Sequence, residues 1–154
     1  MKANFKFSHQ IRVRFAETDM QGFVFNGNYL TYYDVTWTEY FRALGISYED
    51  LRRQGVDTVL ARTTLEFKSP ARFDELIDIY ARVSRIGKTS MVFDFEIHKS
   101  SEEVHVASAS SLYVFIALDS IQPARVPDEL RRQIGRFEGK DFSEASLHDT
   151  GNIT

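Results

Sequence analysis

Apolar and polar residues alternate over several short stretches of the chain, which is the pattern of strands buried on one face. The first stretch is Gln10–Phe15, with its apolar side chains at Ile11, Val13 and Phe15. After Gly55 the alternation returns four times, in Val56–Lys68, Glu75–Ile86, Thr89–Lys99 and Val104–Leu118. Turn signals separate these stretches at Pro70, Gly87 and Ser100–Glu103. We therefore expect five strands, the last four of them consecutive in the sequence.

Residues Tyr29–Leu44 follow the helical period instead. Their polar positions recur every three or four residues and form one narrow stripe, made of Thr31, Asp34, Thr38 and Arg42. The rest of this helix is apolar, so it should be buried over most of its circumference. Asn26 or Asn28 can cap its start, and Gly45 can end it. Two shorter helices are predicted, at Ser47–Gln54 with Ser47 as its cap and at Pro127–Phe137.

A helix that is apolar nearly all round needs a large apolar cover, and a curled five-stranded antiparallel sheet supplies one. The order of elements therefore predicts an α+β fold in which this sheet wraps a long central helix. We expect one domain over residues 1–137 and a polar, flexible tail over residues 138–154. The edges of a small curled sheet commonly pair with another subunit, so a homo-oligomer is expected.

Composition narrows the chemistry. The chain has no cysteine, which excludes disulfides and a cysteine nucleophile. With 19 Lys and Arg against 22 Asp and Glu, its net charge of −3 argues against nucleic-acid binding. No apolar run is long enough to span a membrane, and Met1–Gln10 lacks the apolar core of a signal peptide. These features predict a cytoplasmic protein. The 13 Phe and 7 Tyr residues indicate a bulky core, an aromatic-lined pocket, or both.

The stretch RFAETDMQGFVFNGNY, residues 14–29, carries the candidate chemistry. Asp19 lies in a loop shortly before the long helix, whose unpaired N–H groups can hold an oxyanion. Gly22 and Gly27 allow the backbone to approach a ligand closely. A carboxylate that is ionised beside a helix start suits acyl transfer to water, as nucleophile or as general base. Two other interpretations stay open: Asp19 accepts only turn hydrogen bonds, or Glu17 is the working acid.

These residues resemble the 4-hydroxybenzoyl-CoA thioesterase family, and more narrowly its bacterial acyl-CoA thioesterase branch typified by the Tol–Pal-associated thioesterase. The segments LEFKSPARFD, residues 65–74, and SRIGKTS, residues 84–90, extend the resemblance, which spans roughly Ile11 to Leu118. The resemblance implies the hotdog fold and hydrolysis of acyl-CoA to a carboxylic acid and coenzyme A. It implies neither a metal nor an organic cofactor, since coenzyme A is part of the substrate. It also implies a homodimer or homotetramer with the acyl pocket at a subunit interface.

The family's catalytic residues match three positions of this sequence. Asp19 corresponds to the catalytic aspartate, the main-chain N–H of Asn26 corresponds to the oxyanion donor, and Gly27 continues the same turn. Many members of the close branch carry a histidine at the position of Asn26. Because the family's donor is a main-chain group, the resemblance implies that the oxyanion hole is retained here.

Substrate contacts are expected in two regions. Near the helix start, Gly22 lets the backbone approach a ligand, Phe23 and Phe25 are candidates for covering the acyl pocket, and Tyr29 is a candidate for its floor. The turn Lys88-Thr89-Ser90 resembles a stretch that meets coenzyme A, with Lys88 paired to phosphate. Arg62 and Arg85 are weaker candidates for the same role, and each of these side chains is also explained by core packing or solvent exposure.

Two histidines lie symmetrically about the turn Ser100–Glu103. His98 and His105 should therefore face each other across a hairpin. Without a third ligand nearby they make a poor metal site, so we expect no bound metal.

Two other function classes stay open at this point. A hydratase of enoyl thioesters uses the same fold, but it should show an Asp and His pair near the helix start, and no histidine lies there. A protein that binds acyl thioesters without cleaving them is also compatible with the pattern, although it does not explain an acid beside a predicted oxyanion hole.

Overall fold

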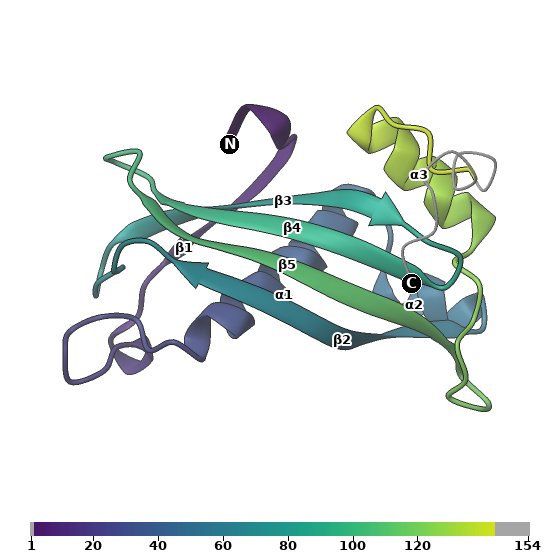
Figure 1. Ribbon diagram of the computed structural model, residues 1–154, viewed down its shortest axis with the longest axis horizontal. Coiled ribbons are helices and arrows are strands. Elements are labelled where there is room, and N and C mark those ends of the chain that lie inside the picture. The colour runs from purple at the N-terminus through teal and green to yellow at the C-terminus, as the bar shows by residue number, and fades with distance from the viewer. Residues whose placement is uncertain (1, 144–154) are drawn as a thin grey trace. The chain divides into compact units, whose positions relative to one another are not determined.

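The computed structural model of the chain describes residues 2–143 and contains a five-stranded antiparallel sheet (Figure 1). Its strands are β1 (Phe7–Arg12), β2 (Val56–Phe67), β3 (Leu76–Ile86), β4 (Ser90–Lys99) and β5 (His105–Ala117). They are ordered β1-β3-β4-β5-β2, so β1 and β2 form the two edges. The helices are α1 (Asn28–Ala43), α2 (Tyr48–Arg53) and α3 (Asp128–Glu138). This confirms the predicted α+β fold of five strands and one long helix.

The described chain packs as two compact units, each with its own part of the strands. The first holds residues 2–43, 64–82 and 94–110, and therefore contains α1 and a segment of every strand. The second holds residues 44–63, 83–93 and 111–143, and contains α2, α3 and the remaining parts of β2 to β5.

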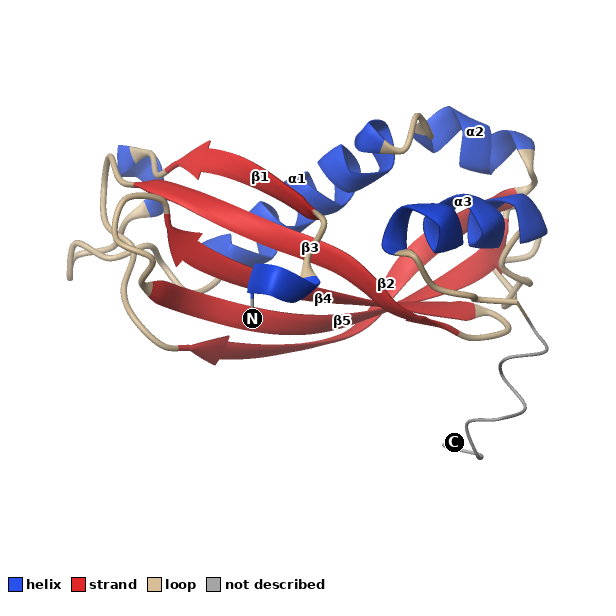
Figure 2. Ribbon diagram, turned by 90° about the horizontal axis from the view of Figure 1, so that it is seen from above, coloured by secondary structure: helices blue, strands red, loops and turns tan. Residues whose placement is uncertain are grey.

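In the first unit, α1 lies on one side of the strands (Figure 2). Tyr33 of α1 packs against Phe95 of β4 with ring centroids 4.8 Å apart, and Tyr40 packs against Phe7 of β1 at 5.5 Å. The alternation in β3 and β4 places their apolar residues on this side, where Ile77, Ile79, Ala81, Phe95 and Ile97 are fully buried. The aromatic face of α1 thus supplies much of this unit's core.

The boundaries of α1 agree with the prediction to within one residue, but the helix is not buried all round. Tyr32 and Tyr40 are completely covered, whereas Leu30 and Val35 are exposed by 43% and 37%. The prediction that this helix is buried over most of its circumference is therefore wrong at Leu30 and Val35. A sheet covers a helix from one side, so apolar residues on the far side stay open within a single chain.

The first strand is displaced from its predicted position. It spans Phe7–Arg12 rather than Gln10–Phe15, and Phe15 begins a 3-10 turn in which its side chain is exposed. The strand ends because Arg14 donates its backbone N–H to the Glu17 carboxylate at 2.8 Å, which turns the chain. The alternation of apolar residues predicts a strand through Phe15, because the alternation does not reveal the hydrogen bond that forms this turn.

In the second unit, α2 begins at the predicted cap, where Ser47 and Asp50 form a reciprocal capping box. Helix α3 buries Leu130 and Ile134 as its spacing predicts. It ends one residue beyond the predicted domain boundary, at Glu138, whose carboxylate accepts the backbone N–H of Val83 at 3.0 Å.

Only part of the predicted tail, residues 138–154, is described. Phe142 is buried and lies shortly after the end of α3. Residues 144–154 lie outside the described residues. The expectation of a flexible tail therefore stays a prediction.

Candidate active site

The loop that carries Asp19 is a small hairpin closed by backbone hydrogen bonds. Phe25 donates its N–H to the Glu17 carbonyl at 2.9 Å, and Asp19 donates its N–H to the Phe23 carbonyl at 2.8 Å. Gly22 closes the tip by donating to the Asp19 carbonyl, and its positive φ of 76° explains why glycine occupies this position. The loop is thus a defined structure that connects Asp19 to the start of α1.

One oxygen of the Asp19 carboxylate is held by the loop and the other is not. Oδ1 accepts the backbone N–H of Gln21 at 2.8 Å and that of Phe23 at 3.4 Å. Oδ2 has no hydrogen-bond partner among residues 2–143, and the side chain is half-buried. Asp19 therefore accepts turn hydrogen bonds, as the simpler interpretation held, and still offers one oxygen to a reacting molecule.

The backbone just before α1 presents two unpaired donors. Within the described part of the chain, the N–H groups of Asn26 and Gly27 make no hydrogen bond, and both residues are exposed. The Asn28 side chain donates to the Glu17 carbonyl at 2.8 Å, which ties the helix start to the acid loop. Such donors at a helix start favour an anion.

Glu17, the competing acid, is structural. Its carboxylate accepts Nη2 of Arg14 at 2.7 Å and the Tyr32 hydroxyl at 2.9 Å, and the residue is buried. Burial raises the pKa of Glu17, but the hydrogen bonds from Arg14 and Tyr32 outweigh it and hold the pKa below its ordinary value. The same surroundings raise the pKa of the Tyr32 hydroxyl, through burial first and then through Glu17.

The aromatic residues predicted to meet the acyl group differ in exposure. Phe25 is exposed, whereas Phe23 is half-buried with the Arg72 guanidinium 4.7 Å above its ring. Tyr29 is buried and packs against Phe67 at 5.3 Å, so it belongs to the core of the first unit. Their contacts with a substrate stay predictions.

The candidates for coenzyme A contact lie in the second unit. Lys88, Arg62 and Arg85 are exposed and have no ion-pair partner in residues 2–143. Lys88 lies in the turn between β3 and β4, which is closed by the Gly87 N–H donating to the Ser90 carbonyl at 2.7 Å. Thr89 and Ser90 are half-buried, and the Thr89 carbonyl accepts the N–H of Phe115 at 2.8 Å.

Sequence reasoning missed the side chain that braces this turn. Arg131 of α3 is buried and donates to the carbonyls of Gly87 at 2.5 Å and Lys88 at 3.2 Å. It lies one residue after Leu130 and three before Ile134, so helical spacing places it on the buried face of α3. A charged residue on an apolar face was the signal that could have identified it.

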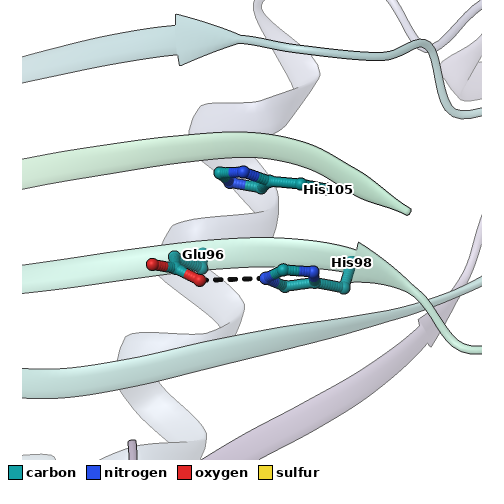
Figure 3. Close-up of side chains that lie close together, drawn as sticks. All are labelled: Glu96, His98 and His105. Atoms are coloured by element: carbon teal, nitrogen blue, oxygen red, sulfur yellow. Dashed lines mark hydrogen bonds and ion pairs between the residues drawn. The ribbon is translucent and has the colours of Figure 1, made fainter. Parts of the chain in front are cut away.

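The two histidines at the β4–β5 hairpin face each other, as predicted. Their rings stack at 4.8 Å with an angle of 12° between planes. The statement that no third ligand lies nearby is wrong, because Glu96 of β4 brings a carboxylate into the same cluster (Figure 3). Its position two residues before His98, on the same side of the strand, was the signal available in the sequence.

Among the described residues, no helix is both long and apolar enough to cross a membrane.

Known proteins resemble this chain over most of its length. The model of the thioesterase superfamily matches residues 21–105. The acyl-CoA thioester hydrolase YbgC of Escherichia coli O157:H7 is 27% identical over 124 residues, covering 80% of this chain and 92% of the relative. The chloroplastic acyl-acyl carrier protein thioesterase ATL3 of Arabidopsis thaliana is 26% identical over 132 residues, covering 86% and 69%. In structure, the 1,4-dihydroxy-2-naphthoyl-CoA thioesterase of Synechocystis aligns with a TM-score of 0.77 and 20% identity, covering 83% of this chain and 94% of that one.

The long helix on a five-stranded antiparallel sheet is the hotdog fold, and the relatives named as thioesterases identify the chain as a hydrolase of thioesters. The chain belongs to the thioesterase superfamily, whose model covers more than half of it.

Proposed function

We propose that this thioesterase hydrolyses acyl-CoA to a free carboxylic acid and coenzyme A, as in the branch typified by the Tol–Pal-associated thioesterase. One observation carries the proposal: a carboxylate oxygen without a partner and two backbone N–H groups without partners lie on one hydrogen-bonded loop. The carboxylate is Oδ2 of Asp19, and the donors are the N–H groups of Asn26 and Gly27. The relatives named acyl-CoA thioester hydrolases support the choice of substrate class.

Asp19 acts on the thioester in one of two ways. As general base, its free oxygen takes a proton from water, the hydroxide oxygen bonds to the carbonyl carbon, and the carbon–sulfur bond then breaks. As nucleophile, the same oxygen bonds to the carbonyl carbon, coenzyme A leaves, and water cleaves the resulting anhydride. In both routes the amides of Asn26 and Gly27 stabilise the oxyanion. The thiolate leaves readily, so neither route needs a dedicated general acid, a metal or an organic cofactor.

The substrate has an apolar part and a phosphorylated part, and the chain offers groups for each. Exposed apolar side chains on and around the acid loop suit the acyl group, namely Phe15, Met20, Phe25 and Phe73. Gly22, Phe23 and Tyr29 complete the proposed acyl contacts. The unpaired cation of Lys88, with Arg62 and Arg85 in support, suits the coenzyme A phosphates, and Thr89 and Ser90 offer hydroxyl groups beside Lys88.

We further propose a homodimer or a homotetramer in the cytoplasm, with subunits meeting along β2. This edge strand carries exposed apolar residues on both of its faces, because Val59 and Leu60 are neighbours and are exposed by 43% and 50%. An edge strand of this kind is a template for pairing with another chain.

Replacing the Asp19 carboxylate tests the proposal. Asp19→Asn keeps the turn hydrogen bonds to Oδ1 but removes the basic oxygen, so kcat/KM for acyl-CoA should fall at least about 100-fold. The release of coenzyme A is followed with a thiol reagent. This reagent does not react with the protein, because the chain has no cysteine. The acyl-CoA substrates in this assay carry short, medium, long and aromatic acyl groups. Asp34→Asn, an exposed acid of α1 in the same unit, is the matched control and should retain full activity.

Three results would contradict parts of this proposal. Undiminished turnover by the Asp19→Asn protein would remove Asp19 from the reaction. Hydration of enoyl-CoA without thiol release would favour the hydratase alternative. Hydrolysis of acyl groups attached to a carrier protein, without hydrolysis of acyl-CoA, would make acyl carrier protein, and not coenzyme A, the carrier of the substrate. The relative named an acyl-acyl carrier protein thioesterase suggests this alternative.

A further inference from the structure

The hairpin between β4 and β5 holds three metal-ligating side chains on one face of the sheet. Glu96 and His98 stand on β4, and His105 begins β5 (Figure 3). Oε2 of Glu96 lies 2.9 Å from Nε2 of His98, and one ligand atom from each of the three residues lies within 4.8 Å of the others. The three donors come from two neighbouring strands, so the hairpin itself assembles them.

We propose that Glu96, His98 and His105 bind a divalent transition-metal ion, with Zn²⁺ as the best match. Two imidazole nitrogens and one carboxylate oxygen are a ligand set that Zn²⁺ takes, and three protein ligands leave a fourth position for water. The set lacks thiolates and is not a ring of oxygens, which disfavours Cu(I) and Ca²⁺.

His98 is the part of the cluster that packing leaves incomplete. Its side chain is only 9% exposed, and its Nδ1 has no hydrogen-bond partner among residues 2–143. Leaving a buried polar atom unpaired costs stability, so such an atom needs an explanation. Nε2 of the same ring contacts Glu96, so a cation accounts for the unpaired atom only if it binds the imidazole through Nδ1.

Metal binding requires a local rearrangement of the rings. The lone pair of each nitrogen lies in its ring plane, and planes 12° from parallel do not direct two lone pairs at one point. One ring must therefore tilt out of the stack. His105 is the freer of the two, since its Nε2 contacts Ser108 Oγ at 2.8 Å and the Ala107 carbonyl at 3.2 Å, and both are local contacts.

A cavity beside the cluster provides access for an ion. Its volume is about 260 Å³, and both Glu96 and Ser108 line it. Three carboxylates, those of Glu66, Asp94 and Glu96, border it against one guanidinium, that of Arg82. Asp94 pairs with Arg82 and Glu66 pairs with Lys68, and the cavity has room for the water ligand.

The role of the ion is to clamp the hairpin rather than to serve hydrolysis. Phe95 packs on Tyr33 of α1, so its neighbour Glu96 points to the opposite face of the sheet. The cluster therefore lies on the side of the strands that faces away from α1, as Figure 3 shows.

Calorimetric titration of tag-free, chelator-treated protein with ZnCl₂ tests the site. The wild type should bind one equivalent. Glu96→Gln, which keeps the shape of the side chain, and the double variant His98→Gln/His105→Gln should each weaken binding at least about tenfold. His9→Gln is the control, because His9 lies on β1 opposite Ile79, outside the cluster, and its affinity should be unchanged.

Circular dichroism shows whether each variant is folded, and Zn²⁺ should raise the melting temperature of the wild type more than that of Glu96→Gln. Absence of binding by the wild type at millimolar Zn²⁺ overturns the proposal. Equal affinity in the wild type and both cluster variants also overturns it, because the ion is then bound elsewhere. Asp19→Asn should bind Zn²⁺ like the wild type, which separates this result from the test of the thioesterase site.

Discussion

Two acids only two positions apart in one loop have different roles, and their hydrogen bonds decide which does what. Glu17 is enclosed by Arg14 and Tyr32, so its carboxylate is already satisfied. One carboxylate oxygen of Asp19 accepts hydrogen bonds from the turn, and the other has no partner among the described residues. Because the Glu17 carbonyl also accepts from Phe25 and Asn28, Glu17 sets the shape of the loop that presents Asp19.

The Glu17 network should make folding stability depend on pH. The pKa of Glu17 is below its ordinary value of 4.5 in the folded protein, so its ionised form stabilises the fold above that pH. This contribution is lost as the pH falls through the lowered folded-state pKa. Glu17→Gln should therefore lower the free energy of unfolding by about 1–3 kcal/mol at pH 7, and the deficit should shrink towards pH 3. Urea unfolding at pH 7 and at pH 3 measures the free energy of unfolding of the wild type and of the variant.

Glu49→Gln is the matched control for this measurement, since Glu49 is an exposed residue of α2. If Glu17→Gln loses the same free energy of unfolding at pH 7 and at pH 3, the result would contradict the stabilising role of the ionised carboxylate.

At the scale of elements, α3 stabilises the β3–β4 turn through a single buried side chain. Arg131 donates to the carbonyls of Gly87, Lys88 and Phe142, and so joins α3 to the turn and to the chain after the helix. Planar guanidinium groups can serve several carbonyls at once, which a lysine cannot do in the same geometry. The turn that presents Lys88 therefore depends on a residue more than forty positions away.

Removing the guanidinium should destabilise the protein strongly. Arg131→Met keeps much of the apolar stem but leaves buried carbonyls unpaired, so the free energy of unfolding should fall by at least about 2 kcal/mol. Arg132→Met is the control, because Arg132 is exposed and pairs with Glu129 at the surface, a contact worth at most about 1 kcal/mol. Urea unfolding of both variants checks the difference, and equal losses would contradict the bracing role of Arg131.

At the scale of the whole molecule, the edge strand β2 is the least covered part of the sheet. Residues 59–62 are all exposed, although a strand of this composition would be expected to bury one face. The prediction that the strand within Val56–Lys68 is buried on one face is therefore wrong at Val59 and Phe67 for a single chain, since both side chains are exposed. A second subunit would cover them.

The oligomer should dissociate when this edge becomes charged. Light scattering during size-exclusion chromatography should give the mass of a dimer or tetramer for the wild type, against 17.8 kDa for one chain. The double variant Val59→Lys/Leu60→Lys should elute as a monomer, because charges on an edge strand oppose pairing. Ile121→Lys, which charges an exposed apolar residue outside the strands, should leave the assembly intact. A wild type that is monomeric would refute pairing along β2.

Local patterns carried most of the fold. The bounds of α1, the capping of α2 by Ser47 and the pairing of His98 with His105 across the turn all follow from spacing within a few residues. The end of β1 and the position of Phe15 did not follow, because a hydrogen bond from Arg14 to Glu17 ends the strand. Periodicity places Arg131 on the buried face of α3 and Glu96 on the same side of β4 as His98, but it does not show which groups they contact, because partners such as Gly87 and His105 lie on other segments of the chain.

The sequence by itself determined the class of fold, the loop proposed as the active site and the acids within it, because periodicity and turn residues act over short range. Only the tertiary structure decided which acid keeps a free oxygen and which apolar residues remain uncovered. Those outcomes depend on contacts between segments that are distant in the chain, such as Glu17 with Tyr32 and Arg131 with Gly87. Hydrogen bonds and burial exist only after the chain has folded, so no local pattern contains them.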